Sequence, residues 1–497
     1  MRRLIAPEDM LSCEKKYFAE SGVPSISIME NAAKALADAA LSRFPAAETI
    51  YIACGPGGNG GDGYACARLL HEAGKKCEIF ASAPAKSPDA AENCRRAMEL
   101  GIPVHLEKLP DAIPGDEDAM SAGVMPDLWI DCLYGTGLSR EPSGRSAQLI
   151  WRMMSAPVIA CDIPSGLNGN TGKAYVPCVR ADVTVTFQLA KFGHFLQDGL
   201  DMCRKVIVAD VGFPKEVFSG VRPPNESVVL FGMDFHLLRR MRNTHKGSYG
   251  HLLIIAGSFG MAGAAALCAK AALRSGVGLV TICCPEEIIP ILQIHAPQAM
   301  CTPLSADNLK KVLPGKTAVA IGPGLTRNID PEILKIVLES GLPAVIDADA
   351  LNILSENPEL KALLKPRNVL TPHPGEAARL LGRKCCDPIA DAKELAAMGA
   401  TVVLKGASRV IASDKINYIS ASGGCGMARG GSGDILTGIL GALLAQRFTN
   451  AHDFCAAVAC EIHGQAGELA QEKYGSYAMN SADIIEFLPE VFRKYAD

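Results

Sequence analysis

The sequence predicts an α/β protein made of two units, each with a largely parallel sheet. Short apolar runs rich in Val and Ile each end in a turn rich in Gly or Asp. Helical patterns lie between these runs, and strands that alternate with helices form parallel sheets with crossover helices. A proline-rich stretch at 213–226 separates two such series and is predicted to be a linker.

Composition indicates an ordinary globular protein of more than one domain. The chain has 497 residues, a length that exceeds what one core normally accommodates. Apolar residues make up 48% and charged residues 21%, which is an ordinary globular balance. Its net charge of −4 gives no basic footprint for nucleic acid. No apolar run reaches the ~20 residues that span a bilayer, so we expect no membrane partner.

The cysteines favour a reducing compartment. All 18 are scattered, and none forms a CxxC pair of the zinc-ligand type. The opening MRRLIAPEDM turns acidic within eight residues and lacks a secretory apolar region. We therefore expect free thiols and a cytoplasmic location.

The first series starts with a helical stretch at 8–43. Its expected strands are 49–54, 128–132, 157–163, 183–187 and 205–211. Three polar loops follow these strand ends: GPGGNGGDG at 55–63, LYGTGL at 133–138 and PSGLNGNTG at 164–172. Ligands on parallel sheets bind beyond the carboxyl ends of the strands, so we expect these loops to converge on one site.

The second series ends in the most informative segment of the chain. Its expected strand-and-loop units are 251–257, 318–324, 344–351, 368–376 and 401–406. The segment GGSGDILTGILGALLA at 430–445 then combines a flexible glycine loop with an apolar run that is typical of a buried helix.

Asp434 follows this glycine loop directly. Curled N–H groups of 430–433 at a helix N-terminus form an anion hole. A carboxylate beside bound phosphate would repel it, but it suits a general base that takes a proton from a hydroxyl during phosphoryl transfer. The alternative interpretation is that Asp434 is the N-cap of a buried helix.

The loops of the first series present oxygen ligands. Asn59, Asp131 and Ser165 offer an amide, a carboxylate and a hydroxyl, which suit an alkali or alkaline-earth cation, although each would equally cap its own turn. Asp162 lies at another strand end, and Lys191 is its expected cationic partner. The run GPGGNG at 55–60, with Glu78 eighteen residues on, is also a weak match to a dinucleotide fingerprint.

Residues 8–215 resemble the epimerase domain of NAD(P)HX repair enzymes. The motifs that carry the resemblance are SIMENAA (27–33), GNGGDG (58–63), DCLYGTGL (131–138) and DIPSGLNGNTG (162–172). It implies a Rossmann-like three-layer domain at 1–222, with Asp162 as a catalytic residue and K⁺ held by Asn59, Asp131 and Ser165. The residues that it implies around the damaged cofactor are Gly58, Asn59, Gly60, Gly61, Asp62, Gly135, Thr136, Gly137, Leu138, Ser139, Arg140, Glu141 and Asp162.

Residues 226–497 are similar to the ribokinase-like NAD(P)HX dehydratases. The matching motifs are HKGSYGHLLIIAGS (245–258), GMAGAA (260–265), GPGL (322–325), DADALN (347–352), TPHPGE (371–376), KG (405–406) and GGSGD (430–434). The resemblance implies a ribokinase-like α/β domain at 223–497 with Asp434 as the catalytic base. The residues that it implies around substrate and nucleotide are Ala264, Gly324, His373, Lys405, Gly406, Ala407, Ser408, Arg409, Gly433 and Asp434.

Together the two resemblances imply a bifunctional repair enzyme. The first domain would interconvert the R and S epimers of hydrated NADH and NADPH. The second would dehydrate the S epimer with ADP and release AMP and phosphate. The fused order, taken as bacterial and archaeal, implies ADP as the donor, and Mg²⁺ is expected with Asp347 or Asp349 as candidate ligands. The dehydratase family also implies a homo-oligomer.

Two other interpretations stay open. The C-terminal half is also compatible with a kinase of the hydroxymethylpyrimidine or hydroxyethylthiazole type, because GSGD serves any chemistry that begins by phosphorylating a hydroxyl. A kinase releases a phosphorylated product, whereas a dehydratase releases inorganic phosphate. The N-terminal half is compatible with a non-catalytic binding domain, although it retains Asn59, Asp131 and Asp162.

Overall fold

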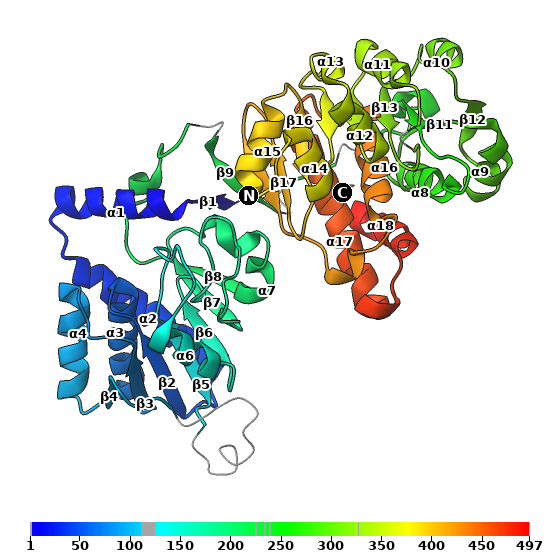
Figure 1. Cartoon of the computed structure of the whole chain (residues 1–497). Helices are drawn as coiled ribbons and strands as arrows, with labels where there is room; N and C mark the ends of the chain where they lie inside the picture. Colours follow the sequence, from blue (N-terminus) through cyan, green and yellow to red (C-terminus); the bar gives the residue numbers. More distant parts are fainter. Residues whose placement is uncertain are drawn as a thin grey trace. The chain divides into compact units, whose positions relative to one another are not determined.

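The computed structural model describes residues 2–110, 125–223, 226–232, 235–237, 240–326 and 328–496. The chain divides into two compact units, Arg3–Pro223 and Pro224–Asp497, the latter together with Met1–Arg2. Each unit is an α/β layer structure, which confirms the predicted fold class (Figure 1). Among the described residues, no helix has both the length and the apolar character needed to cross a membrane.

The first unit contains one parallel sheet in the order β4-β3-β2-β5-β6-β7-β8. Its strands are β2 (Thr49–Cys54), β3 (Lys76–Ala81), β4 (Val104–His105), β5 (Leu128–Cys132), β6 (Val158–Cys161), β7 (Val183–Phe187) and β8 (Lys205–Ala209), and the short strand β1 (Arg2–Leu4) begins the described chain. Its helices are α1 (Pro7–Ser21), α2 (Ser25–Arg43), α3 (Gly58–Glu72), α4 (Pro88–Glu99), α6 (Gly144–Met153) and α7 (Gly199–Cys203), with 3₁₀ turns η1 (Phe192–Phe195) and η2 (Lys215–Phe218).

Alternating side chains of these strands bury both faces of the sheet. On β2, Ile50 and Ile52 pack with α2 and α3, whereas Tyr51 packs with Trp129 and with α6 on the opposite face. Because both faces are covered, the strands are near-continuous apolar runs, as parallel sheets require. The result is the predicted three-layer arrangement of helices, sheet and helix.

The predicted linker is only partly correct. Phe213 and Phe218 are buried in a cluster with Met10, and Arg222 forms an ion pair with Asp9 of α1. The first part of this stretch therefore packs onto the first unit. Prolines mark where regular structure stops, but they do not indicate whether the neighbouring side chains are buried.

The second unit has the strand order β9-β18-β17-β16-β15-β14-β13-β10-β11-β12. Its strands are β9 (Val228–Phe231), β10 (His251–Ile255), β11 (Leu279–Cys284), β12 (Met300–Pro303), β13 (Ala318–Ile321), β14 (Ala344–Ile346), β15 (Asn368–Leu370), β16 (Thr401–Leu404), β17 (Arg409–Ala412) and β18 (Asn417–Ser420). The expectation of a parallel sheet holds from β12 to β16, but β17 runs antiparallel to β16 and β18.

Helices cover both faces of this second sheet. They are α8 (Ala262–Arg274), α9 (Ile289–His295), α10 (Ala306–Val312), α11 (Pro331–Glu339), α12 (Asp349–Glu356), α13 (Pro358–Lys361), α14 (Pro374–Leu381), α15 (Pro388–Ala396), α16 (Ser432–Ala445), α17 (His452–Ala478) and α18 (Ser481–Ala496), with 3₁₀ turns η4 (Lys246–Tyr249), η5 (Glu286–Ile288) and η6 (Cys425–Met427). Helices α8, α16, α17 and α18 share the largest buried cluster with one face of the sheet. Every residue of 435–445 is buried, which confirms the predicted buried helix.

The close approach of α3 to the sheet gives a stability prediction. An ideal Cβ on Gly60 would lie 1.8 Å from the carbonyl oxygen of Gly55, whereas a Cβ on Gly58 would meet nothing within 4 Å. Gly60→Ala should therefore destabilise the first unit by about 1–3 kcal/mol or more through overpacking. Gly58→Ala, in the same helix, should be neutral or slightly stabilising. Thermal unfolding of the two variants checks this, and equal midpoints would contradict it.

Candidate functional site

The first candidate site lies where the strand order of the first sheet reverses. β2 is flanked by β3 and β5, so the connections after β2 and β5 lead to opposite sides, and the carboxyl ends at such a reversal are where parallel sheets bind ligands. Asn59, in the first turn of α3, lies beside the loop after β5, because an ideal Cβ on Gly135 would come within 3.5 Å of Asn59 Oδ1. The structure thus brings together two of the three loops that the sequence predicted to converge.

The glycines of the first loop differ in role. Gly58 is exposed, but Gly60 and Gly61 are buried, and a Cβ on Gly61 would collide with Met29 at 2.6 Å. The absence of side chains at Gly60 and Gly61 is therefore explained by helix packing rather than by a ligand. Packing explains why both positions are glycine, and Gly58, Asn59, Gly60, Gly61 and Asp62 all stay proposed contacts.

The loop after β5 lies open at the same end of the sheet. Its implied contact residues are partly or fully exposed: Gly135, Thr136, Gly137, Leu138, Ser139, Arg140 and Glu141. Tyr175 donates a hydrogen bond to the carbonyl oxygen of Ser139 at 3.4 Å, which ties this loop to the loop after β6.

The predicted cation ligands lie at three neighbouring strand ends. Ser165 donates its hydroxyl to Asp131 Oδ1 at 2.6 Å and its N–H to Oδ2 at 2.7 Å, while Asn59 donates to the carbonyl oxygen of Cys161 at 3.4 Å. Asp131 is fully buried, and burial raises its pKa to about 6. Within the described residues its partners are hydrogen-bond donors and no cationic side chain. A hard monovalent cation fits such a donor set.

Asp162 is held in a strained conformation by an ion pair. Its φ of 62° is left-handed, which costs a non-glycine residue free energy and often marks a functional position. Lys191 Nζ contacts its Oδ1 at 2.5 Å, and Thr186 donates to the same oxygen at 2.8 Å. The predicted pairing of Lys191 with Asp162 is therefore confirmed. Burial opposes ionisation, but Lys191 holds the pKa of Asp162 below its ordinary value.

His194 supports this strained turn from the other side. Its Nδ1 accepts the N–H of Lys191 at 3.1 Å, so its Nε2–H donates to the carbonyl oxygen of Asp162 at 2.9 Å. Burial and the charge of Lys191 lower the pKa of His194 to about 4, so the ring stays neutral near pH 7.

Two further carboxylates lie near Asp162, and the sequence analysis missed one of them. Burial and the charge of Asp162 raise the pKa of Asp62 well above its ordinary value. Glu14 of α1 was not predicted, although burial and Asp162, opposed by Lys191, raise its pKa to about 7. Its signal in the sequence was a carboxylate on the apolar face of α1, between Met10 and Tyr17.

The second candidate site lies at the reversal of the second sheet, between β10 and β13. The N–H of Gly257 donates to the carbonyl oxygen of Pro323 at 2.8 Å. Gly324 has a φ of 63°, and a Cβ there would lie 3.0 Å from the Cβ of Ala264. Gly324 and Ala264, both predicted contacts, are therefore neighbours, and the close approach of the two loops requires a glycine.

Asp434 lies in the first turn of α16 and does not cap it. The N-cap is Gly431, with a φ of 95°, and no side chain caps the helix. The capping interpretation of Asp434 is therefore wrong, because the helix starts at Ser432, before Asp434. The N–H of Ser432 donates to the carbonyl oxygen of Arg429 at 3.4 Å, but within the described residues no backbone acceptor takes the N–H groups of Gly433 and Asp434, which are therefore available to an anion. Burial and the charge of Asp347, opposed by Lys405, raise the pKa of Asp434 to about 7.

A buried ion pair supports the floor of this site. Lys405 Nζ contacts Asp347 Oδ1 at 2.7 Å, and Thr437 of α16 donates to Asp347 Oδ2 at 2.7 Å. A Cβ on Gly433 would lie 3.4 Å from Lys405 Nζ, so the ammonium lies directly beside the glycine loop. The pair thus places a cation next to the anion hole. Helix α16 packs against β13 and β14, and the ends of β14 and β16 supply Asp347 and Lys405.

The two carboxylates considered for Mg²⁺ are already engaged. Asp347 is held by Lys405 and Thr437, and Asp349 accepts the N–H of Thr326 at 2.8 Å and the amide of Asn352 at 3.3 Å. Within the described residues, no group of three or more His, Cys, Asp and Glu side chains is arranged to hold a metal ion. Because Lys405 already neutralises Asp347, that carboxylate does not fit as a direct Mg²⁺ ligand, whereas Asp349 accepts only neutral N–H groups and stays a candidate.

The remaining predicted contacts differ in exposure. His373 is a half-exposed N-cap of α14, whose Nδ1 accepts the N–H of Gly375 at 3.0 Å, and its pKa is lowered by burial and by Lys405. Gly406 and Ala407 are exposed, but Ser408 and Arg409 are buried, so their side chains support the loop from inside.

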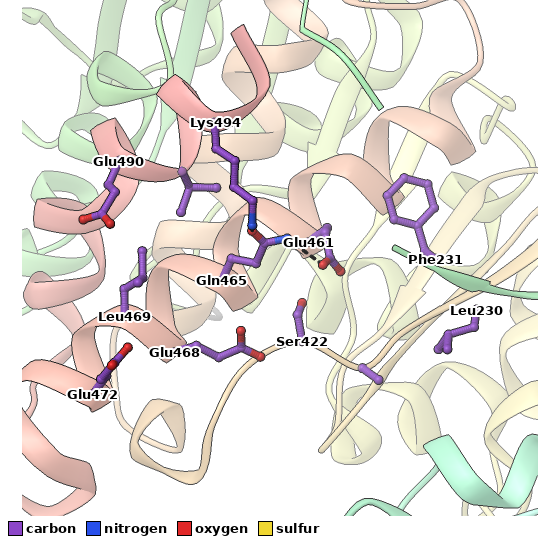
Figure 2. A pocket seen from close by; sticks show the side chains of 12 residues that line it. Leu230, Phe231, Ser422, Glu461, Gln465, Glu468, Leu469, Glu472, Glu490 and Lys494 are labelled. Carbon is purple, nitrogen blue, oxygen red and sulfur yellow. Dashed lines mark hydrogen bonds between the residues drawn. The ribbon is translucent and has the colours of Figure 1, made fainter. Parts of the chain in front are cut away.

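A separate pocket of about 510 Å³ lies on the α17 and α18 side of the second unit. Figure 2 shows the acidic side chains Glu461, Glu468, Glu472 and Glu490 around it, together with Lys494. None of the predicted contact residues lines it. The pocket is therefore distinct from the site that contains Asp434.

Comparison with known proteins gives a match for each unit. The family described as "YjeF-related protein N-terminus" matches residues 25–193, and the family described as "NAD(P)H-hydrate dehydratase" matches residues 252–490. The match to the first family starts after α1, so Glu14 lies outside it.

Relatives match over nearly the whole chain. A bifunctional NAD(P)H-hydrate repair enzyme of Coxiella burnetii is 37% identical over 95% of this chain and 96% of its own length. One of Leishmania braziliensis is 30% identical over 95% of this chain and 90% of its own. Because Leishmania is a eukaryote, the fused order is not confined to bacteria and archaea, and the argument from that order to ADP is weaker than expected.

Among solved structures, an ADP/ATP-dependent NAD(P)H-hydrate dehydratase from Bacillus subtilis, co-crystallised with ATP/Mg²⁺, is 31% identical. It matches 52% of this chain and 95% of its own, with a TM-score of 0.45.

Proposed function

Since the chain belongs to the family of bifunctional NAD(P)H-hydrate repair enzymes, we propose that it repairs hydrated NADH and NADPH through two activities. The first unit is the epimerase of the R and S hydrates. The second unit is the dehydratase of the S hydrate, with ADP as the phosphoryl donor. This assigns 1–222 and 223–497 to the two activities.

The observation that supports this function best is that the Asp434 carboxylate, in the first turn of an uncapped helix, forms no hydrogen bond within the described residues. The pKa of this carboxylate is raised to about 7, and it lies beside an open helix N-terminus. A carboxylate that only stabilised the fold would be hydrogen-bonded. A group that exchanges a proton near neutral pH suits general-base catalysis.

Phosphorylation is needed because the hydroxyl of the hydrate is a poor leaving group. The hydrate has a hydroxyl at C6 of its ring, and hydroxide leaves slowly near neutral pH. Asp434 takes the hydroxyl proton as that oxygen attacks the terminal phosphorus of ADP, and AMP departs. Loss of phosphate from C6 and of a proton from the neighbouring carbon restores the ring double bond. The N–H groups of α16 and Lys405 stabilise the charge on the transferred phosphoryl group.

The nucleotide is proposed to lie between the glycine loop and the strand end at Lys405. Gly406 and Ala407 offer exposed backbone there, and Gly433 lies beside the Lys405 ammonium. Mg²⁺ is proposed as the counterion of the ADP phosphates, with Asp349 as a candidate ligand. Gly324, Ala264 and His373 are proposed to contact the hydrated ring.

The first unit contains the groups that epimerisation requires. Inversion at C6, by ring opening or by exchange of the hydroxyl, needs one group that accepts a proton and another that returns it. Asp162 stays ionised beside Lys191, whereas Glu14 and Asp62 hold protons to higher pH. K⁺ held by Asn59, Asp131 and Ser165 would compensate the buried charge of Asp131.

The alternatives receive less support from the relatives. A kinase of the hydroxymethylpyrimidine or hydroxyethylthiazole type would share the glycine loop, but the named relatives are repair enzymes. A purely binding role for the first unit leaves the strained Asp162 and its ion pair unexplained. We also propose a cytoplasmic homo-oligomer that acts on small molecules and has no nucleic-acid or membrane partner.

Substitution of Asp131 tests the first unit and its cation. Asp131→Asn keeps the shape but removes the charge, so epimerisation should fall at least tenfold and lose its dependence on K⁺, while dehydration of the S hydrate stays unchanged. The control is Asp127→Asn, at the opposite end of the same strand, where the carboxylate accepts two backbone N–H groups. Equal epimerisation by the unsubstituted chain with and without K⁺ would contradict a functional cation.

Substitution of Asp434 tests the second unit. Asp434→Asn keeps the size but cannot accept the proton, and loss of a positioned general base costs about 10²–10⁴-fold in rate. ADP should still bind, because a negative charge beside the phosphates has been removed. The control is Asp387→Asn, a true helix N-cap whose carboxylate accepts the N–H groups of Ile389 and Ala390.

The pH dependence provides a second readout of the same prediction. Asp434 is active as a base only when ionised, and its pKa in the free chain is about 7, so kcat/KM for dehydration should rise as the pH increases through about 7. The residual rate of Asp434→Asn should lack this rise. A variant within a few-fold of the unsubstituted rate would rule out Asp434 as the base.

A further inference from the structure

His463 of α17 joins the two segments that are proposed to hold the nucleotide. Its Nδ1 lies 3.4 Å from Arg409 Nη2, at the start of β17, and its Nε2 lies 3.4 Å from Ser432 Oγ, at the start of α16. The ring is only 4% exposed. A buried histidine therefore links Arg409, at the start of β17, to Ser432, at the start of α16.

The direction of these hydrogen bonds is fixed by Arg409. A guanidinium can only donate, so Nδ1 of His463 must accept and Nε2 must bear the proton. Nε2–H then donates to Ser432 Oγ, and the hydroxyl hydrogen of Ser432 is left to point away from His463. Burial and the charge of Arg409 lower the pKa of His463 to about 3, so this neutral form persists near pH 7.

Ser432 is well placed to use that hydrogen. It is the first residue of α16, it is partly exposed, and it precedes Gly433 and Asp434 directly. Within the described residues, His463 is the side chain in contact with its hydroxyl. An oriented hydroxyl at a helix N-terminus adds one donor to the N–H groups that face an anion.

Close packing fixes the position of His463. A Cβ on Gly464 would lie 2.1 Å from Ser422 Oγ, and one on Gly467 would lie 2.1 Å from Met427 Sδ. Helix α17 therefore packs closely against the segment 422–427. Arg409 also donates to the carbonyl oxygen of Ser422. The imidazole therefore has little freedom to turn away from Ser432.

We propose that His463 is a positioning residue that aims the Ser432 hydroxyl at the ADP phosphates. The inference rests on the proposed function, since it concerns how that nucleotide is held. His463 does not touch the reacting atoms. It acts through Ser432, and its loss should weaken ADP binding more than it slows the chemical step.

Two polar variants of the full chain separate this role from packing. His463→Gln places an amide N–H near the position of Nε2 and should keep ADP affinity within about threefold. His463→Asn is too short to reach Ser432 and should raise KM for ADP about tenfold, the size of one hydrogen bond to a charged group. Ser432→Ala should match it, and the double variant should lose nothing more, because both changes remove the same interaction.

The control is Gln465→Leu, two residues along the same helix. Gln465 is also buried, but it donates to Glu461 on the side of the separate pocket, as the dashed line in Figure 2 shows. It should leave KM for ADP unchanged. Equal KM values for the Gln and Asn variants, or additive losses with Ser432→Ala, would overturn the role of His463. Absence of ADP-dependent dehydration in the unsubstituted chain would instead overturn the proposed function.

Discussion

Burial of carboxylates at the carboxyl ends of two parallel sheets is the constraint on which both sites depend. Such a group must find a cation, find donors or retain its proton. Asp162 and Asp347 are paired with Lys191 and Lys405. Asp434 is left without a protein donor among the described residues, and its pKa rises to about 7. In the second unit, this difference separates Asp347, whose ion pair holds the site in place, from Asp434, which is proposed to move a proton.

Parallel topology explains why these groups meet although they are far apart in sequence. The order of each sheet reverses next to its first central strand, β2 or β10, which is where parallel sheets bind their ligands. Lys405 and Asp347 come from the ends of β16 and β14, and Thr437 of α16 ties the helix to both. The ion pair therefore sets the position of the anion hole relative to the sheet.

The α/β class, the two series of strands and the buried helix at 435–445 could be predicted because they are local patterns of apolar residues and glycines. The antiparallel β17 and β18 were not predicted, since a short apolar strand has the same pattern in either direction. Glu14 and His463 were missed for a different reason. The residues that Glu14 and His463 interact with lie more than 30 positions away in the chain, and no local spacing encodes such contacts. The close packing of Gly60 against Gly55 was not predicted either, and it explains why residue 60 is a glycine.

The most direct test is to incubate the full chain with mixed epimers of hydrated NADH and with ADP, and to follow dihydronicotinamide absorbance and inorganic phosphate together. The account predicts that both epimers are consumed completely, with one phosphate and one AMP released for each NADH recovered. Accumulation of a stable phosphorylated product without recovery of absorbance, or consumption of the S epimer alone, would contradict it.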